Sequence, residues 1–562
     1  MKQRVLAGFL AVTLVFGLCG CAKKTAEKEA SPKEVQEQAA EETETAAEEK
    51  TDTTEESAPL TVLTCGKSYY EYDEEIEQEL FSGITEGVVL AEECKDAYPK
   101  LYDALQKNWE QVLADSDKYA MEQKKEARTL YEEVVANGGE PGYMNHFVCE
   151  NKVYVHRADE KVLSYSTNNY TFLGGVHGMY GDFGDTFDAQ TGEKLKLSDV
   201  ITDPKAYGQI LFDKVSENYP DVVDYLEDPN TLRDQIVEEV SSPDAYNWEL
   251  DPDGIVYFFN PYDIAAYAAG QQIIKVGYKE QPELFNEAYL PPEGRDYVCD
   301  APAGNNFMLD ADGDGKFEID SVYPHYVEDS GDYSTYAGFD VGIGEGQTIT
   351  IAEDFYLYEA TGCYAQFANG KTYLLVDCQT DNDYHEVIVC EVGNGDVREV
   401  GRYGVTPRYE SYEEESGIYY AYAYTDPAAM QMSEHFDRLS TYYAGGTYRM
   451  TDQGKIEPLG DYAYLSEGNR DYFVLTSTAE IQADIVDEKG GVKESDATFP
   501  EGTHFTIYRT SYPSDAWDEC QVDCLLEDGT IVRFNYTMDS DGNRLVNGQN
   551  EWDIFDNLLY AG

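Results

Sequence analysis

The sequence predicts an α+β fold in its N-terminal half, followed by mainly-β domains. Helical spacing of apolar residues occurs only before residue 240, as in residues 97–113. After Pro291-Pro292 the composition shifts toward Tyr, Gly and Asp, and short strand-like runs alternate with turn signals. The chain has 562 residues, of which 42% are hydrophobic, so it exceeds one ordinary domain and can bury several cores.

The first residues have the form of a targeting signal. Lys2 and Arg4 precede an apolar run, residues 5–18, that is too short and wrongly flanked for a transmembrane helix. Leu18-Cys19-Gly20-Cys21 then resembles a bacterial lipobox, which implies cleavage before Cys21 and lipid attachment to its thiol. The alternative is an ordinary signal peptide with incidental cysteines. We expect residues 1–21 to be a lipoprotein signal and the protein to be anchored on the extracytoplasmic face of the cell membrane.

The charge of the chain limits the classes of partner. There are 110 acidic and 40 basic residues, a net charge of −70. A nucleic acid is excluded as a partner because its phosphates would be repelled. A cationic partner, divalent ions or simple solubility all fit this charge. Residues 22–58 are rich in Ala, Glu, Lys and Thr, and they are expected to form a disordered acidic tether.

The cysteines beyond the lipobox do not form a disulfide framework. Their number is odd, their spacing is sparse and no C-x-x-C pair occurs. We interpret them as small core residues, and the compartment would also allow disulfides, for which no pairing is assigned. The nine are Cys65, Cys94, Cys149, Cys299, Cys363, Cys378, Cys390, Cys520 and Cys524.

Residues 59–168 are predicted to form a first α+β domain. A strand is expected at residues 69–72, and two helical runs follow, 97–113 and 119–135, ended by Gly138-Gly139 and Pro141-Gly142. Alternating apolar positions then predict strands at residues 147–156 and 161–166.

Residues 169–292 are predicted to form a second α+β domain. A Gly-rich turn, a strand over 181–188 and a Thr191-Gly192 hairpin open it, and helices are expected at 206–219 and 230–240. Ser198 or Asp199 could cap a short helix. The domain closes with buried strands over 255–259 and 272–278, separated by Asn260-Pro261 and small residues up to Gly270. In this stretch Tyr257, Phe258, Tyr262 and Tyr267 are expected to pack rather than to react.

Several separated motifs of this domain carry a resemblance. They are Gly175-x-His177-Gly178, the Thr191-Gly192 turn, the segment from Leu195 to Val200, and the block from Gly254 to Gly270. Together they resemble the extracellular family called domain of unknown function 3298. Residues 60–165 resemble, more weakly, the companion domain of unknown function 4163.

The resemblance implies an α+β fold in a bacterial envelope protein. Relatives include an anti-sigma factor that binds lysozyme and a peptidoglycan deacetylase with a separate catalytic domain. This sequence shows no membrane-spanning helix, so sequestration of a sigma factor is not expected. Thr186-Phe187-Asp188 is followed by Ala189 instead of a second Asp, and no two histidines are four residues apart, so the deacetylase motifs are missing.

The last part of the chain is predicted to be β-structure. Residues 300–475 contain strand-like runs at 373–378, 385–392, 418–424 and 447–451, in a propeller-like or sandwich-like domain without a clean repeat. Residues 476–562 contain strands at 505–510, 521–526 and 530–536, in a small domain that weakly resembles an SH3-like barrel.

One acidic loop has the pattern of a calcium site. Asp310, Asp312 and Asp314 stand at alternate positions with Gly315 sixth, Lys316 would bind through its carbonyl, and Glu318 would bind directly or through water. The twelfth position is Ser321, so this is not an EF-hand. An acidic hairpin without an ion is the alternative, and a bound Ca²⁺ would be structural.

No catalytic motif is found. None of the seven histidines has metal-ligand spacing with another, although His177 lies within the family-like turn. Nucleophile elbows and phosphate loops are also missing. The 48 tyrosines suit strands first and a binding surface second. We therefore expect a lipid-anchored binding protein of the envelope whose ligand is a cell-wall glycan or a cationic, lysozyme-like protein. The alternatives are a glycan-modifying enzyme and a structural envelope protein.

Overall fold

The computed structural model describes residues 60–74, 77–139, 146–224, 226–243, 245–301, 309–311, 319, 321–327, 335–343, 347–380, 384–393, 395–515 and 520–560. All elements below belong to one unit, Ser57–Gly562. The predicted signal, Cys21 and the whole of the predicted tether, residues 22–58, lie outside the described residues. The N-terminal half contains helices and strands, and the C-terminal half consists mostly of strands. The predicted fold class, α+β followed by mainly-β structure, is therefore confirmed.

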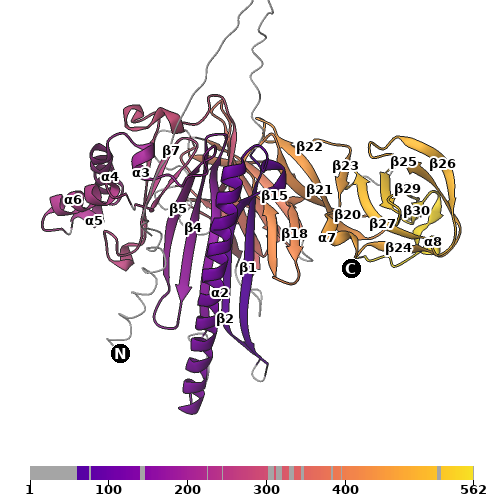
Figure 1. The fold of residues 1–562 in the computed structure, drawn as a ribbon, viewed down its shortest axis with the longest axis horizontal. Coiled ribbons are helices and arrows are strands. Elements are labelled where there is room, and N and C mark those ends of the chain that lie inside the picture. Colours follow the sequence, from indigo (N-terminus) through magenta and orange to yellow (C-terminus); the bar gives the residue numbers. More distant parts are fainter. Residues whose placement is uncertain are drawn as a thin grey trace, which may run out of the picture. The chain divides into compact units, whose positions relative to one another are not determined.

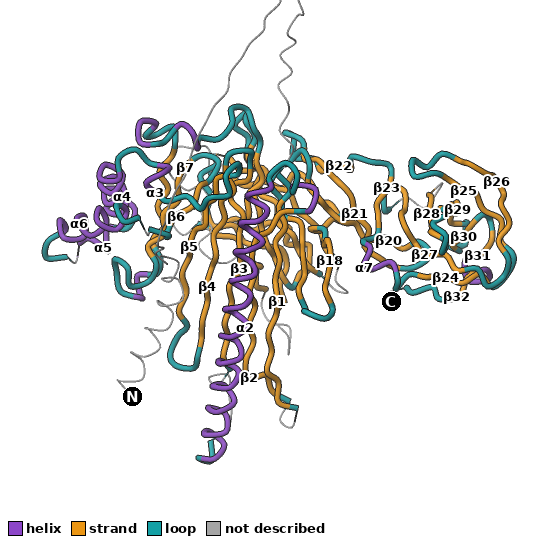
Figure 2. The backbone as a smooth tube through the Cα atoms, in the orientation of Figure 1, coloured by secondary structure: helices purple, strands orange, loops and turns teal. Residues whose placement is uncertain are grey.

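The first sheet has seven strands in the order β18-β19-β1-β2-β3-β4-β5. Neighbouring strands are antiparallel except β2 and β3, which are parallel. A parallel pair needs a crossover, and α2 provides it; Figures 1 and 2 show this helix running along the strands. The bounds are β1 Val62–Asp73, β2 Gln78–Leu90, α2 Pro99–Ala136, β3 Phe147–Ala158, β4 Val162–Phe172, β5 Met179–Asp188, β18 Tyr409–Glu413 and β19 Ile418–Tyr422, with a short 3-10 turn at Glu92–Cys94.

Helix α2 is one helix of 38 residues, where the sequence predicted two. Residues 114–118, between the predicted runs, contain neither Gly nor Pro, so nothing breaks the hydrogen-bond ladder. Leu101, Leu105 and Trp109 are buried on its inner face. Trp109 packs over Gly87 of β2, where an added Cβ would come within 2.4 Å of the indole ring.

A helical layer and a second small sheet follow. Asp203 and Asp228 cap α4 and α6 by accepting hydrogen bonds from backbone N–H groups. Leu211 and Ile236 of these helices join Tyr257 and Ile274 in one core. The bounds are α3 Leu197–Val200, α4 Pro204–Asn218, α5 Pro220–Asp224, α6 Pro229–Val240, β6 Trp248–Leu250, β7 Gly254–Phe259 and β8 Gln272–Gly277, with 3-10 turns at Tyr267–Ala269, Pro282–Leu284 and Glu287–Tyr289.

Two further sheets come from residues 297–403. The five-stranded sheet has the order β16-β15-β14-β13-β9, and the three-stranded sheet has the order β10-β11-β12. Their inner faces share one core that includes Leu374, Ile388 and Phe339. The bounds are β9 Tyr297–Ala301, β10 Ser321–Val327, β11 Thr335–Gly342, β12 Thr348–Leu357, β13 Glu359–Gln366, β14 Thr372–Gln379, β15 His385–Gly393 and β16 Asp396–Tyr403.

The largest sheet runs through the C-terminal region along β17-β20-β21-β23-β27-β28-β29-β25-β26. It continues across residue 475, where two predicted domains adjoin. Its bounds, with those of the strands paired to it, are β17 Val405–Pro407, β20 Met430–Asp437, β21 Thr441–Met450, β22 Ile456–Pro458, β23 Tyr462–Tyr464, β24 Val474–Ser477, β25 Ile481–Val486, β26 Val492–Phe499, β27 His504–Ser511, β28 Cys520–Leu525, β29 Ile531–Met538, β30 Arg544–Val546, β31 Gln549–Asn550 and β32 Phe555–Asp556. Two short helices, α7 Glu467–Arg470 and α8 Glu551–Ile554, accompany it.

All nine cysteines beyond the lipobox are buried, as expected for small core side chains. No helix in the described part of the chain is long and apolar enough to cross a membrane.

Candidate functional site

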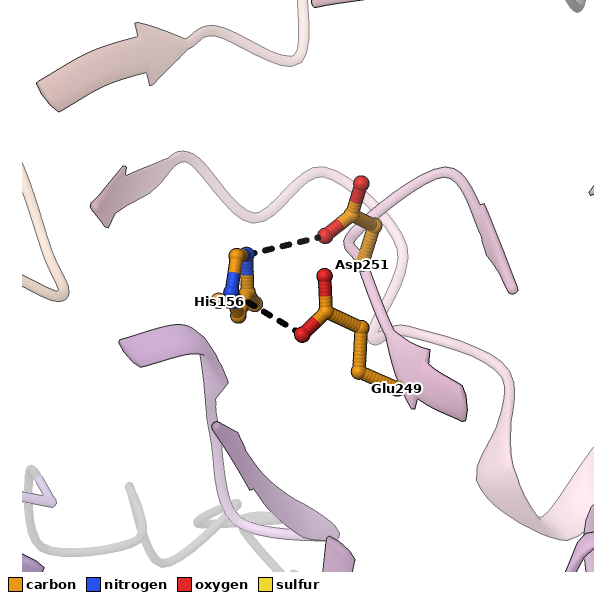
Figure 3. A group of neighbouring side chains, drawn as sticks. All are labelled: His156, Glu249 and Asp251. Carbon is orange, nitrogen blue, oxygen red and sulfur yellow. Dashed lines mark ion pairs between the residues drawn. The ribbon is translucent and has the colours of Figure 1, made fainter. Parts of the chain in front are cut away.

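A buried ion cluster joins the first sheet to the small sheet β6-β7-β8. It consists of His156 on β3 and of Glu249 and Asp251, which come from β6 and the residue after it. The pairing of β3 with β4 shifts register between Val155 and Arg157, so His156 lies in a bulge that re-aims its side chain. Glu249 and Asp251 alternate around Leu250, which turns both carboxylates to the same side. Figure 3 shows both carboxylates directed at the imidazole ring.

The contacts within this cluster are short. His156 Nε2 lies 2.9 Å from Glu249 Oε2, and His156 Nδ1 lies 3.5 Å from Asp251 Oδ1. His156 Nε2 also hydrogen-bonds Ser166 Oγ on β4 at 2.8 Å. Behind the triad, the fully buried Lys275 Nζ forms ion pairs with Asp251 Oδ2 at 3.0 Å and Asp253 Oδ1 at 2.5 Å.

The cluster strongly perturbs its own acid–base equilibria. Burial lowers the pKa of His156, but the carboxylates of Glu249 and Asp251 raise it more, to about 10. Burial raises the pKa of Glu249 to about 7 against the attraction of His156. Burial also acts on Asp251, yet Lys275 and His156 hold its pKa at about 2. Such perturbed groups mark candidate sites, although buried structural ion pairs produce the same signature.

A second feature, the aromatic surface cluster, consists of His177, Tyr180, Tyr262 and Tyr267. His177 stacks on Tyr267 with ring centroids 4.0 Å apart, and Tyr180 and Tyr262 pack against the same ring at 6.0 and 5.8 Å. The Tyr267 hydroxyl donates to the Gly178 carbonyl at 2.8 Å, which ties the Gly-rich turn to the segment after Asn260-Pro261. His177 Nδ1 lies 2.9 Å from that same carbonyl oxygen.

Tyr262 is, with His177, one of the two residues of this cluster that are exposed to solvent. Its side chain is 53% exposed and its backbone has φ 77°, a conformation that is rare outside glycine. Asp263 Oδ2 accepts from the Asn260 N–H at 2.8 Å, and the Tyr262 N–H donates to the Ala265 carbonyl at 3.1 Å, so the turn is held from both sides. Tyr257 and Phe258 are buried, whereas Tyr262 packs one side of its ring against Tyr267 and leaves about half of its side chain exposed.

The Gly-rich turn adds exposed apolar surface beside this cluster. Val176, next to His177, is 96% exposed, and Leu173 is 39% exposed. Gly174 and Gly175 have positive φ values of 74° and 138°, which lets the turn protrude. An exposed apolar turn beside an exposed tyrosine is typical of a surface that binds a partner.

Of the predicted calcium ligands, only Asp310 lies among the described residues. It is buried, and Leu309 and Ile319 form an antiparallel bridge with hydrogen bonds of 2.9 and 3.2 Å that closes the loop. The Asp310 carboxylate is one of the groups that raise the pKa of Lys275. Asp312, Asp314, Lys316 and Glu318 lie outside the described residues, so calcium binding stays a prediction.

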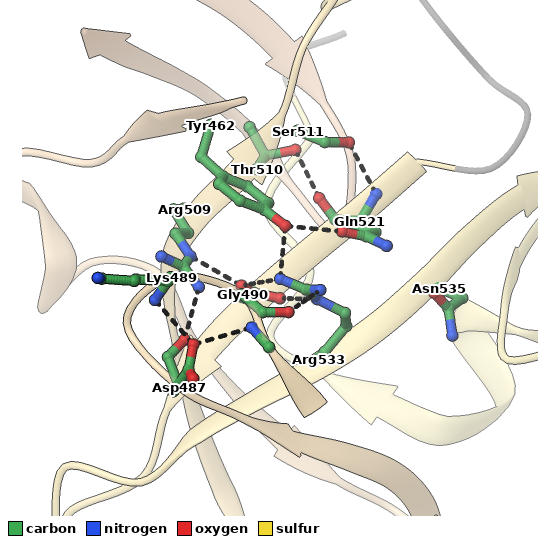
Figure 4. A network of polar contacts seen from close by, with 12 residues as sticks. Tyr462, Asp487, Lys489, Gly490, Arg509, Thr510, Ser511, Gln521, Arg533 and Asn535 are labelled. Carbon is green, nitrogen blue, oxygen red and sulfur yellow. Dashed lines mark hydrogen bonds and ion pairs between the residues drawn. The ribbon is translucent and has the colours of Figure 1, made fainter. Parts of the chain in front are cut away.

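A third polar cluster, around Asp523, lies in the C-terminal sheet. Arg509 Nε and Arg533 Nε each lie 2.7 Å from Asp523, and all three side chains are buried. Figure 4 shows both arginines beside Tyr462 and Gly490. The Arg533 Nη1 donates to the Gly490 carbonyl at 2.9 Å, and Arg509 donates to the Asp487 and Glu488 carbonyls. Both guanidinium groups lie over the Tyr462 ring. Because these donors reach backbone carbonyls, the cluster fixes the loop between β25 and β26.

Sequence reasoning missed His156, Glu249 and Asp251. The available signal was the alternation Trp248-Glu249-Leu250-Asp251, which puts both carboxylates on one face of a short strand. Nothing in the sequence pairs them with a histidine 93 residues earlier, as 249 − 156 gives.

Comparisons with known proteins identify two segments. Residues 198–279 match the model of DUF3298, a protein family of unknown function, and residues 90–180 match that of the deacetylase PdaC. No curated protein matches.

Two solved structures are similar to part of the chain. A DUF3298 family member from Bacteroides fragilis is 20% identical with a TM-score of 0.32, and the match covers 41% of this chain and 96% of that one. A DUF3298 family protein from Pseudomonas aeruginosa PAO1 is 15% identical with a TM-score of 0.28, covering 42% and 99%. The predicted resemblance is confirmed: residues 198–279 match the DUF3298 family, and a segment that matches the PdaC family model precedes them.

Proposed function

We propose that this protein is a lipid-anchored, extracytoplasmic binding protein of the bacterial envelope, and that its ligand is a cationic, lysozyme-like protein. The observation that carries the proposal is Tyr262, an exposed aromatic side chain held in a left-handed turn. Strained backbone that the surroundings fix in place is characteristic of functional positions. A rigid, exposed tyrosine also provides contact area at a low entropic cost.

The surroundings of Tyr262 favour a protein over a glycan. A sugar ring stacks on an open aromatic face, but His177 already covers one face of Tyr267 at 4.0 Å. The neighbouring surface is apolar, with Val176 and Leu173 exposed, and a glycan would need hydrogen-bonding side chains there. Apolar and tyrosine-rich surface suits the centre of a protein interface.

The charge of the chain supports a cationic partner. A net charge of −70 speeds the encounter with a positively charged protein and makes that encounter sensitive to salt. The lipid anchor at Cys21 would hold the acidic chain at the membrane surface, where such a partner arrives.

An enzymatic role on cell-wall glycans is the second candidate, favoured by the name of the PdaC model that residues 90–180 match. The described group of side chains best suited to acid–base chemistry is His156 with Glu249 and Asp251, and these are between 2% and 9% exposed. Such burial leaves a polymeric substrate no access, so binding is the function that we propose.

The test compares Tyr262→Ala with the wild-type protein for binding of lysozyme at low and high salt. The wild-type protein should bind lysozyme at low ionic strength. Tyr262→Ala should raise the dissociation constant about tenfold or more, as truncation of an interface anchor does. Tyr356→Ala on β12 is the matched control, because Tyr356 is 67% exposed outside the cluster. Failure of the wild-type protein to bind lysozyme at low salt would remove the proposal, and release of acetate from purified cell wall would favour the enzyme.

A further inference from the structure

The residues that join β3 to β6 have the composition of a metal site. His156, Glu249 and Asp251 each offer one ligand atom, and these three atoms lie within 4.8 Å of one another (Figure 3). We propose that they bind one divalent transition-metal ion of the zinc class, which ties the PdaC-like segment to the DUF3298 segment.

Two buried oxygens carry this proposal. In the described part of the chain, Glu249 Oε2 and Asp251 Oδ1 have no partner other than the His156 ring nitrogens, at 2.9 and 3.5 Å, although the two residues are only 2% and 3% exposed. Burial of a carboxylate oxygen without a donor is costly. Both oxygens point at the same imidazole, so one cation between them and the ring would satisfy both.

The partners around the triad leave the right atoms for an ion. His156 Nε2 lies 2.8 Å from Ser166 Oγ and 2.9 Å from Glu249 Oε2, so a neutral ring that carries its proton on Nε2 keeps the lone pair on Nδ1 for the metal. Histidine ligands commonly have such a second hydrogen bond. Lys275 pairs with Asp251 Oδ2 at 3.0 Å, which leaves Oδ1. The 3.5 Å between Nδ1 and Oδ1 is close to the roughly 3.3 Å between two ligands of a tetrahedral zinc ion.

The ligand types select the class of ion. One imidazole nitrogen and two carboxylate oxygens suit Zn²⁺ or Mn²⁺ and do not suit the soft ions that prefer thiolates. A dication would neutralise the two carboxylates. Because all three ligands are buried, the ion would be taken up during folding and would be structural.

The competing occupant is a proton that makes His156 an imidazolium ion between the carboxylates. Metal content separates the two possibilities. Tag-free full-length protein, incubated with zinc sulfate and passed through a desalting column, should retain about one zinc per chain by plasma mass spectrometry and release it on unfolding. Its melting temperature should rise on zinc addition.

Variants and spectroscopy locate the ion. Glu249→Gln with Asp251→Asn should abolish stoichiometric binding, whereas Asp377→Asn should not, because Asp377 pairs with His385 at 3.0 Å without a second carboxylate ligand. X-ray absorption should show nitrogen and oxygen neighbours. If the ligand variants do not fold, the zinc content and the melting-temperature shift of the wild-type protein test the proposal. Retention of less than about one tenth of an ion per chain, no shift in melting temperature, or sulfur neighbours from the cysteines would overturn the proposal.

Discussion

At the residue scale, Tyr262 and Tyr257 show how one stretch of sequence serves two purposes. Tyr257 is fully buried and donates its hydroxyl to Glu239 at 2.9 Å, while Tyr262, five residues later, is exposed. Both belong to the same aromatic run, and residue type does not tell them apart. The backbone does, because Asn260-Pro261 ends the strand and φ turns positive at Tyr262.

This difference predicts opposite effects of substitution. Tyr257→Ala should destabilise the protein by about 3–5 kcal/mol because it opens a cavity and leaves Glu239 without its donor. Tyr262→Gly should leave the melting temperature equal or raise it, because glycine adopts a positive φ without strain. Thermal unfolding of both variants measures this, and a large loss of stability for Tyr262→Gly would contradict the assigned strain.

Asp263 predicts a pH dependence of the same turn. Burial raises its pKa to about 6, although the Asn260 N–H opposes the shift. A carboxyl whose pKa is raised on folding contributes most stability below its unfolded value near 4, and that contribution is lost as the pH rises to about 6. Because Asp263 is half-buried, the expected loss is about 1 kcal/mol.

The measurement compares melting temperatures of wild type and Asp263→Asn between pH 4 and pH 6.5. Asparagine keeps an acceptor for the Asn260 N–H and does not titrate. The wild-type melting temperature should therefore fall relative to that of the variant as the pH rises, and parallel curves would show that Asp263 is not responsible.

At the scale of elements, the packing of α2 on β2 depends on Gly87. A Cβ at this position would lie 2.4 Å from the Trp109 ring, so Gly87→Ala should cost about 1–3 kcal/mol through overpacking. Gly393→Ala is the control, because nothing lies within 4 Å of its added Cβ. Chemical denaturation should give a lower free energy of unfolding for Gly87→Ala than for Gly393→Ala. Equal free energies of unfolding would show that the indole of Trp109 moves aside.

The acidic sequence after Leu309 carries the calcium prediction. If the acidic loop binds Ca²⁺, calorimetry should show one binding event in the wild-type protein that Asp312→Ala removes. The same heat in wild type and variant would leave the loop as an acidic hairpin. Asp541→Ala in the acidic turn at residues 539–543 provides a matched control, since Asp539 there accepts hydrogen bonds from the backbone N–H groups of Asp541 and Asn543.

Local elements followed well from the sequence. Strands β7, β14, β27 and β29 and helices α4 and α6 lie within a few residues of their predicted positions, because each has a strong apolar period and clear Gly, Pro or Asp boundaries. The sequence predicted two helices where α2 is continuous, because the mainly polar residues 114–118 interrupt the apolar period. The ion cluster around His156 was missed because strand pairing, which sequence pattern does not encode, brings its members together.

At the scale of the whole molecule, pairings between distant segments dominate. Strand β19 pairs with β1 in the register Leu63↔Tyr422, so residues 409–422 complete the sheet that begins at residue 62. A chain that ends at residue 292 keeps both family-matching segments but leaves β1 as an edge. An uncovered edge strand recruits other strands.

We therefore expect the chain truncated after residue 292 to self-associate at concentrations at which the full-length protein does not. Light scattering coupled to size-exclusion chromatography measures this. Gly66→Pro in the truncated chain should reduce the association, because the backbone of Gly66 faces β19 in the full-length protein and proline removes that donor from the edge. If the truncated chain is a monodisperse monomer, the exposed edge of β1 does not cause self-association and the prediction is wrong.

The pairing of β1 with β19 also implies a delay between the synthesis of the two strands. Leu63 leaves the ribosome 359 residues before Tyr422, as 422 − 63 gives. At translation rates of about 5–20 residues per second, the partner of β1 appears roughly 20–70 s later. Until then the first strand has one row of amide and carbonyl groups unpaired, so this edge of the sheet stays open until about three quarters of the chain has been made.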